Sequence, residues 1–332
     1  MNSIDTDRID AADIFLSCSD LTETLDFYTE SLGFRIEMIY PADSPRIAVV
    51  SGYGIRVRLD RNIDSAPADL SLELAPLEPS LVVRQLVSDD DWGAGRAGMQ
   101  YRDLIPGRLG GRYIASHIRI PDGGPVPDYV HHHHILFQLI YCYKGWVRVV
   151  YEDQGPPFVM KAGDCVLQPP HIRHRVLECS DGFEVVEIGC PAEHATLIDH
   201  DLELPTVDLK SDRDFGGQAF HFHQSAEADW LPWRIDGFEM RDTGIGAATR
   251  SLVSVVAVRP VGEQGTAVIN QDTELLFGFV LVGSMSLECD GEERWNLAAG
   301  DSFTIPAELN SALSNFSNDL EFLEVVSPAP KP

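Results

Sequence analysis

An internal repeat in roughly the last two thirds of the chain constrains the fold more than any other feature. From about residue 113 onward, short apolar segments alternate with Gly- and Pro-containing turns, which is typical of an all-β sandwich or barrel. The segment SHIRIPDGGPVPDYVHHHHILFQLIYCYKG aligns with SVVAVRPVGEQGTAVINQDTELLFGFVLVG, and GDCVLQPPHIRH aligns with GDSFTIPAELNS. The matched residues, 138 or 137 positions apart, are Ser116 with Ser254, Gly124 with Gly262, Gly145 with Gly283 and Gly163 with Gly300. The repeat predicts two copies of one β-barrel unit.

The first copy carries a dense cluster of histidines, six of the eleven in the chain: His131, His132, His133, His134, His171 and His174. Side chains at i and i+2 of a strand point to the same face. His131 and His133 can therefore meet one ion, with His174 from a neighbouring strand as the third ligand. A competing register, in which His132 and His134 face inward, is open at this stage.

The spacing of these residues resembles the two motifs of the cupin family. The first motif reads Gly124, His131, His133, Gln138 and Gly145, and the second reads Gly163, Pro169, His171, His174 and Glu178. The resemblance implies two double-stranded β-helix barrels over about 113–332. It also implies His131, His133, Gln138 and His174 as the ligands of a divalent metal ion.

The family usually has a glutamate where this chain has Gln138. Three imidazoles and an amide leave the charge of a dication uncompensated, so the site should favour an anionic or chelating substrate. Gln138 can either bind the ion directly or hydrogen-bond a ligand of the ion. Further candidates for contacts around the ion or the substrate are His132, His134, His171, Arg173 and Arg119.

The second copy lacks the histidines. Its aligned positions are Ile269, Gln271, Leu276 and Ser311, while Gly283, Gly300, Pro306 and Asn315 persist. We therefore expect the metal in the first barrel only, with the second barrel as a structural partner.

A different pattern precedes the repeat. Residues 13–61 predict the order βαβββ, with Ser19 or Asp20 capping a helix that Gly33 ends. The phrase DLTETLDFYTESLGF resembles the vicinal-oxygen-chelate family, which includes glyoxalase I, over one module of about fifty to sixty residues. The first strand offers Phe15, Leu16 and Ser17 instead of a metal ligand, so we expect a structural or dimerising role.

These patterns predict a mainly β chain in four parts. A glyoxalase-like module occupies 1–75 and a connection occupies 76–112. The metal-binding cupin barrel spans 113–205 and the degenerate barrel 206–332. Within residues 62–112, which are rich in Pro, Asp and Gly, we expect a strand near 70–74 and helix near 81–87.

The three-histidine set resembles that of non-haem Fe(II) dioxygenases that cleave carbon–carbon bonds in diketones or hydroxylated aromatic acids. Fe(II) is thus the favoured cofactor, with Zn, Ni or Mn as alternatives. Cupins also include lyases, isomerases, cyclases and ligand-binding or regulatory proteins, so the fold alone does not choose the reaction.

Net charge indicates which classes of binding partner are disfavoured, and the cysteines and the N-terminal sequence indicate the cellular compartment. A net charge of −27 disfavours nucleic acid and membrane surfaces as partners. The resemblance to cupin enzymes implies a small molecule, anionic or chelating, as the substrate. The six cysteines lie in apolar segments without a C-x-x-C pair, which indicates buried free thiols. The N-terminal sequence MNSIDTDRIDAAD has neither a basic nor an apolar region, so we expect a cytoplasmic protein, and exposed sheet edges favour a homodimer.

Overall fold

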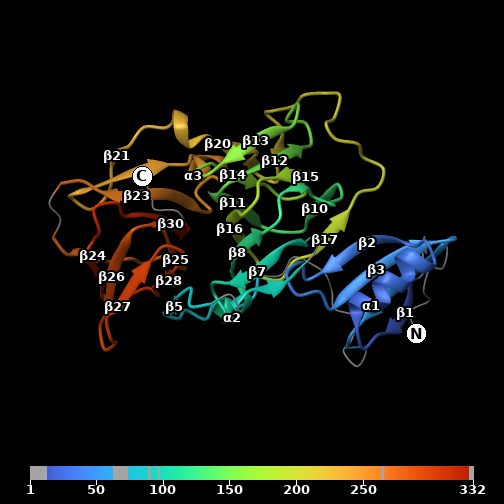
Figure 1. Cartoon of the computed structure of the whole chain (residues 1–332), viewed down its shortest axis with the longest axis horizontal. Helices are drawn as coiled ribbons and strands as arrows, with labels where there is room; N and C mark the ends of the chain where they lie inside the picture. The colour runs from blue at the N-terminus through green and yellow to red at the C-terminus, as the bar shows by residue number, and fades with distance from the viewer. Residues whose placement is uncertain (1–12, 63–73, 89–90, 96–97, 263–264, 329–332) are drawn as a thin grey trace, which may run out of the picture.

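The computed structural model describes residues 13–62, 74–88, 91–95, 98–262 and 265–328. The chain is mainly β (Figure 1). An N-terminal module lies at one end, a first barrel in the middle and a second barrel at the opposite end. This confirms the expected fold class.

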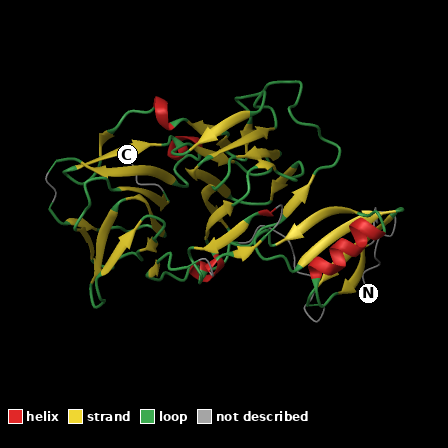
Figure 2. Ribbon diagram, viewed as in Figure 1, coloured by secondary structure: helices red, strands yellow, loops and turns green. Residues whose placement is uncertain are grey.

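The N-terminal module has the expected βαβββ order. Its elements are β1 (Asp13–Ser17), α1 (Leu21–Asp26), a π-helical turn (Phe27–Ser31), β2 (Arg35–Tyr40), β3 (Ile47–Gly52) and β4 (Ile55–Asp60). Asp20 caps α1 by accepting a hydrogen bond of 3.0 Å from the Glu23 N–H group. The strands pair in the order β1-β4-β3-β2, and α1 covers one face of this sheet (Figure 2).

The two barrels repeat the same strands. The segment that leads into the first barrel contains β5 (Val82–Arg84), β6 (Gly93–Ala94), β7 (Gln100–Asp103) and the short α2 (Arg108–Gly111). The first barrel continues with β8 (Ile114–Ile120), β9 (Gly124–Pro125), β10 (His131–His133), β11 (Phe137–Lys144), β12 (Trp146–Tyr151), β13 (Phe158–Lys161), β14 (Cys165–Gln168), β15 (His174–Cys179), β16 (Phe183–Cys190) and β17 (Thr196–Ile198). The next segment contains β18 (Asp214–Phe215), β19 (Gln218–Ala219), β20 (His221–His223), a 3-10 turn (Ser225–Glu227), β21 (Leu231–Pro232), β22 (Phe238–Asp242) and α3 (Ile245–Ala248). The second barrel ends the chain with β23 (Ser254–Pro260), β24 (Ala267–Ile269), β25 (Leu275–Val282), β26 (Ser284–Cys289), β27 (Trp295–Ala298), β28 (Ser302–Thr304), β29 (Ser311–Ser314) and β30 (Glu321–Ser327).

The barrels pack against each other through equivalent strands. The outward residues Phe137, Leu139 and Tyr141 of β11 share one buried cluster with residues of β25. The β25 members are Leu275, Phe277 and Phe279, each 138 positions after its counterpart. Because the alternate residues of β11 point the other way, the same strand lines the interior of the first barrel.

The barrels also exchange strands. Strand β5, which precedes the first barrel in sequence, pairs with β28 of the second barrel. Strand β20, which follows the first barrel, pairs with β14 of the first barrel. The helix expected near 81–87 is therefore wrong: Val82 and Val83 complete a sheet instead, because tertiary pairing overrides local preference. The strand expected at 70–74 falls on residues 63–73, outside the described part of the chain, apart from Leu74.

The N-terminal module continues the sheet of the first barrel. Strand β17 pairs with β2 on one side, and on the other side it pairs with β10, which carries the histidines. The sheet thus runs without interruption from β1 to β13. Strand β2 of the module therefore lies two strands away from the histidine strand β10 in one continuous sheet.

All six cysteines are free and buried, and burial raises the pKa of each thiol. Among the described residues, no helix is long and apolar enough to cross a membrane.

Candidate metal centre

The structure brings three of the expected ligands together inside the first barrel. His131 and His133 project from β10, and His174 lies opposite His131 on β15. One nitrogen of each ring lies within 4.8 Å of one nitrogen of each of the others. The ring centroids are 4.3 Å apart for His131 and His174, and 5.2 Å apart for the other two pairs.

Each of these rings is held from behind by an oxygen acceptor. His131 Nδ1 lies 2.8 Å from the Tyr129 carbonyl, and His174 Nδ1 lies 3.0 Å from the Ile172 carbonyl. His133 Nδ1 lies 3.1 Å from Thr196 Oγ1 on β17. The two carbonyls can only accept, so they fix the hydrogen of His131 and His174 on Nδ1 and leave each Nε2 lone pair for a metal ion, the usual arrangement behind metal-binding histidines. The Thr196 hydroxyl can accept from His133 in the same way. The donor set therefore fits a divalent transition metal.

Gln138 faces the same interior. Its side chain is buried on β11, and its Oε1 has no hydrogen-bond partner among the described residues. A buried amide oxygen without a partner costs free energy, which a bound cation or a hydrogen-bond donor would recover. Both roles considered for Gln138 fit this position.

The histidines line a cavity of about 100 Å³ with a mainly apolar wall. The polar groups around it are Asp43, Gln138, Tyr151, Gln168, Glu187 and His194 in addition to the three histidines. The apolar wall residues include Met99, Ile118, Ile140, Val149, Met160, Phe183 and Val185. No lysine or arginine lines the cavity within the described ranges.

His132, His134 and His171 lie on the other side of the strand. The His171 ring packs against those of His132 and His134 at centroid distances of 5.5 and 5.3 Å. His132 and His134 are half-buried, whereas His131 and His133 are buried, so the alternation of β10 places the latter pair inward. Burial, with Arg173 nearby, lowers the pKa of His132 to about 4.

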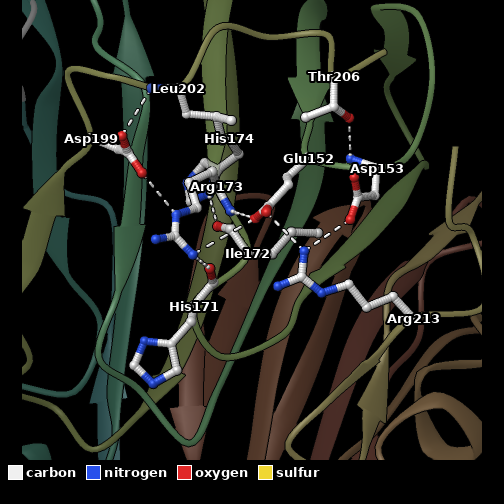
Figure 3. Close-up of polar contacts among 10 residues, drawn as sticks. All are labelled: Glu152, Asp153, His171, Ile172, Arg173, His174, Asp199, Leu202, Thr206 and Arg213. Atoms are coloured by element: carbon white, nitrogen blue, oxygen red, sulfur yellow. Dashed lines mark hydrogen bonds and ion pairs between the residues drawn. The ribbon is translucent and has the colours of Figure 1, made fainter. Parts of the chain in front are cut away.

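Neither of the arginines named as candidates reaches the cavity. Arg173 is held on the outside of the barrel by Asp199, 3.1 Å away, and its backbone N–H donates to Glu152 (Figure 3). Arg119 donates to Gln100 and stacks over the Trp92 ring at 4.2 Å. Because strand neighbours of inward residues point outward, both arginines belong to the barrel surface.

Sequence reasoning did not single out His194, Tyr151 and Gln168. Tyr151 stacks on His174 with ring centroids 5.5 Å apart and accepts a hydrogen bond of 2.8 Å from Gln168. His194, in the turn after β16, packs edge-on against His133 at 5.3 Å. None of the three has motif spacing, although Tyr151 ends β12 next to the histidine strand β15, and Gln168 pairs with Gln138 across β14 and β11.

The second barrel has side chains where the first has its cavity. Phe303 lies against Gly278, the counterpart of Ile140: a Cβ atom at position 278 would be 2.2 Å from the Phe303 ring. Ile269, Leu276, Met285 and Phe322 belong to the same buried cluster. The apolar filling and the absence of histidines explain why this barrel does not repeat the site.

Comparison with known proteins agrees with this architecture. A family model described as an AraC-like ligand binding domain matches residues 115–193. No curated protein sequence matches the chain. Similar solved structures include oxalate decarboxylase from Bacillus subtilis, at 12% identity and TM-score 0.53, covering 79% of this chain and 78% of that chain.

Two further structural matches cover nearly all of their own chains. The putative glyoxylate-induced protein from Pseudomonas aeruginosa has 13% identity and TM-score 0.54, covering 81% of this chain and 95% of that chain. Protein Ylba from E. coli has 9% identity and TM-score 0.55, covering 81% and 100%. The fold is thus that of a bicupin, with a three-histidine group in one barrel. At these identities the likeness shows the fold alone.

Proposed function

We propose that this chain is a metal-dependent bicupin enzyme that acts on a small chelating substrate in the first barrel. The observation that carries the proposal is the convergence of His131, His133 and His174 on a mainly apolar cavity. Their Nδ1 contacts and the unpartnered Gln138 Oε1 fit a resident divalent ion. Of the possible ions we favour Fe(II), with Mn, Zn and Ni as alternatives.

The residues that line the cavity would have different roles. His131, His133 and His174 would hold the ion, and Gln138 would bind it weakly or orient a ligand of the ion. A bound Fe(II) would polarise the substrate oxygens and supply the redox chemistry for a reaction with O₂. The apolar wall, which includes Ile140, would exclude bulk water from the reacting atoms.

The cavity lining favours a dioxygenase for diketone-like or hydroxy-acid substrates over an enzyme for small dianions. A dianion would need cationic partners, and none lines the cavity among the residues described. The alternative is a non-redox metal enzyme: oxalate decarboxylase, which has the same fold, contains Mn(II) centres. A ligand-binding or regulatory role is the third candidate, favoured by the AraC-like match.

Metal analysis and oxygen uptake test the proposal. Protein purified without a histidine tag should contain close to one iron per chain and should consume O₂ with a panel of β-diketones and hydroxybenzoates. Tightly bound Mn or Zn without O₂ uptake would favour the non-redox enzyme. Protein without bound metal would contradict the proposal.

We further propose a cytoplasmic homodimer. Free buried thiols suit a reducing compartment. Among the strands that the structure describes, β1 pairs with β4 alone, and its residues Ile14, Phe15 and Leu16 are exposed, so this edge is a candidate contact between two copies. Sedimentation at micromolar concentration should give twice the chain mass of 36.7 kDa.

A further inference from the structure

The N-terminal module reaches the cavity of the first barrel. The loop between β2 and β3 places Ala42 and Asp43 in the cavity lining, although both residues lie about 90 positions before the first histidine of the site. The module therefore supplies part of the wall around the proposed metal centre.

Two sets of polar contacts hold this loop in place. At its two ends, the Tyr40 hydroxyl and the Arg46 guanidinium both donate to the Glu193 carboxylate, Arg46 at 3.0 and 2.5 Å. The Arg46 hydrogen bonds lower the pKa of Glu193, so this carboxylate is ionised at neutral pH. In the middle of the loop, Asp43 pairs with Arg108 through Oδ2. The loop is thus tied to Glu193, just after the first barrel's β16, and to Arg108 in the segment that leads into this barrel.

His194 directly follows the residue to which the loop is tied. It is 4% exposed, and its Nδ1 is 3.2 Å from the Pro191 carbonyl. This contact fixes the hydrogen on Nδ1 and leaves Nε2 as an acceptor. Nε2 is buried and has no hydrogen-bond partner among the described residues, and the ring lines the cavity. A buried acceptor of this kind requires a donor from a bound molecule.

We propose that Asp43 and His194 form a second polar subsite, which binds a hydrogen-bond donor on the substrate. The inference rests on the proposed metal function: one end of the substrate chelates the ion, and a hydroxyl or ammonium group near the other end meets Asp43 and His194. The N-terminal module is then a specificity element of the active site. Substrates with a second carboxylate at that end are disfavoured.

The charges around the cavity support this choice of substrate. Both groups of the subsite are acceptors, and Glu187 adds a second carboxylate to the lining. The Arg108 charge is directed to Asp43 and lies outside the lining. A carboxylate tail would meet like charge without a cationic partner, and the net charge of −27 adds to the repulsion.

Three chelating probes with the same head and different tails test the proposal. The protein is loaded with Co(II), and the visible spectrum of the cobalt reports binding of glycine hydroxamate, acetohydroxamate and malonate monohydroxamate. We expect glycine hydroxamate, the ammonium probe, to bind at least tenfold more tightly than malonate monohydroxamate, the carboxylate probe. The affinity of acetohydroxamate, the methyl probe, should lie between them. Asp43→Asn should reduce this ratio to less than threefold, and His194→Phe should weaken the ammonium probe without changing the carboxylate probe.

Two further variants separate a local effect from a general one. Arg108→Gln should increase the ratio, because it removes the cation that Asp43 faces. Asp122→Asn makes the same charge change as Asp43→Asn, at an exposed turn, and should leave the ratio unchanged. If the cobalt-loaded protein binds all three probes with equal affinity, the subsite proposal alone is overturned. The same holds if Asp43→Asn leaves the ratio of ammonium-probe to carboxylate-probe affinity unaltered. Failure to bind cobalt would overturn the proposed metal function and the subsite with it.

Discussion

His131 and His174 lie directly opposite each other across the β10–β15 ladder, and their ring centroids are 4.3 Å apart. The same backbone pairing in the second barrel joins Ile269 and Ser311 across β24 and β29. The two barrels thus share a scaffold that can present ligands, and only one copy has the side chains to do so. The first two predictions concern those side chains.

Alanine at His131 should abolish tight binding of a divalent ion, whereas alanine at His132 should not. Loss of one of three imidazoles removes a large share of the coordination energy, while the His132 ring packs outside the barrel against His171. Isothermal titration of the apoprotein with Co(II) measures the difference. Equal loss in both variants would contradict the inward register, and two ions per wild-type chain would contradict a single site.

Glutamate at Gln138 should tighten binding of a divalent ion by about tenfold, because a carboxylate adds Coulombic attraction to the dication. Affinity for acetohydroxamate, which binds metals as an anion, should fall in parallel because the net charge of the site is lower. Calorimetry of both steps provides the measurement, with Gln154→Glu as a control for added charge. A variant that loses the ion but binds the probe normally would show that position 138 does not face the site.

Alanine at Gly278 should destabilise the protein by about 1–3 kcal/mol, because the added Cβ would overlap the Phe303 ring in a filled core. The matched control is Gly265→Ala, where the added Cβ meets nothing within 4 Å. Chemical denaturation followed by tryptophan fluorescence compares the two. Equal stabilities would mean that the second barrel has room that the packing does not show.

The free energy of unfolding should fall as the pH drops below about 6.5, and His117 should contribute to the fall. This buried ring contacts Phe279 of the second barrel, and burial lowers its pKa, although Glu184 at 2.7 Å opposes the shift. The unfolded chain takes up a proton near pH 6.5 and the folded chain only at lower pH. The contribution is therefore complete above pH 6.5 and is lost toward the lowered pKa, at no more than about 1.4 kcal/mol per pH unit.

Denaturation of the His117→Gln variant at pH 5 and pH 7.5 provides the test. Its stability should depend less on pH than that of the wild type, whereas the exposed His200→Gln variant should behave as the wild type does. An unchanged pH dependence in His117→Gln would assign the effect to other groups.

Sequence patterns were sufficient to predict the two barrels, because the repeat indicates two copies of one unit. The i, i+2 spacing of His131 and His133 was sufficient to place both side chains on one face of a strand. The βαβββ module was also predictable, since Asp20 and Gly33 mark the ends of its helical segment. The counterpart positions Ile269 and Ser311 were correctly aligned for the same reason.

The part of the cavity lining that Asp43 and His194 form could not be predicted from the sequence. Asp43 and His194 come from loops about 150 residues apart, and neither loop has a periodic pattern. Strand β5 was mistaken for helix because its three residues pair with β28, more than 200 positions away, and not with a neighbour in sequence that the structure describes. Contacts of this kind depend on how finished barrels pack, which local patterns do not encode.

The exchange of β5 and β20 has a consequence for how this protein can be made and how it can change. Strand β20, from the segment before the second barrel, lies at the edge of a first-barrel sheet, and β5, from the segment before the first barrel, lies at the edge of a second-barrel sheet. Neither sheet is complete when the two halves are separated. A fragment ending at residue 205 would lack β20 and would expose the edge of β14. We therefore expect the two barrels to unfold together, and we expect the first barrel to need the barrel without histidines in order to fold.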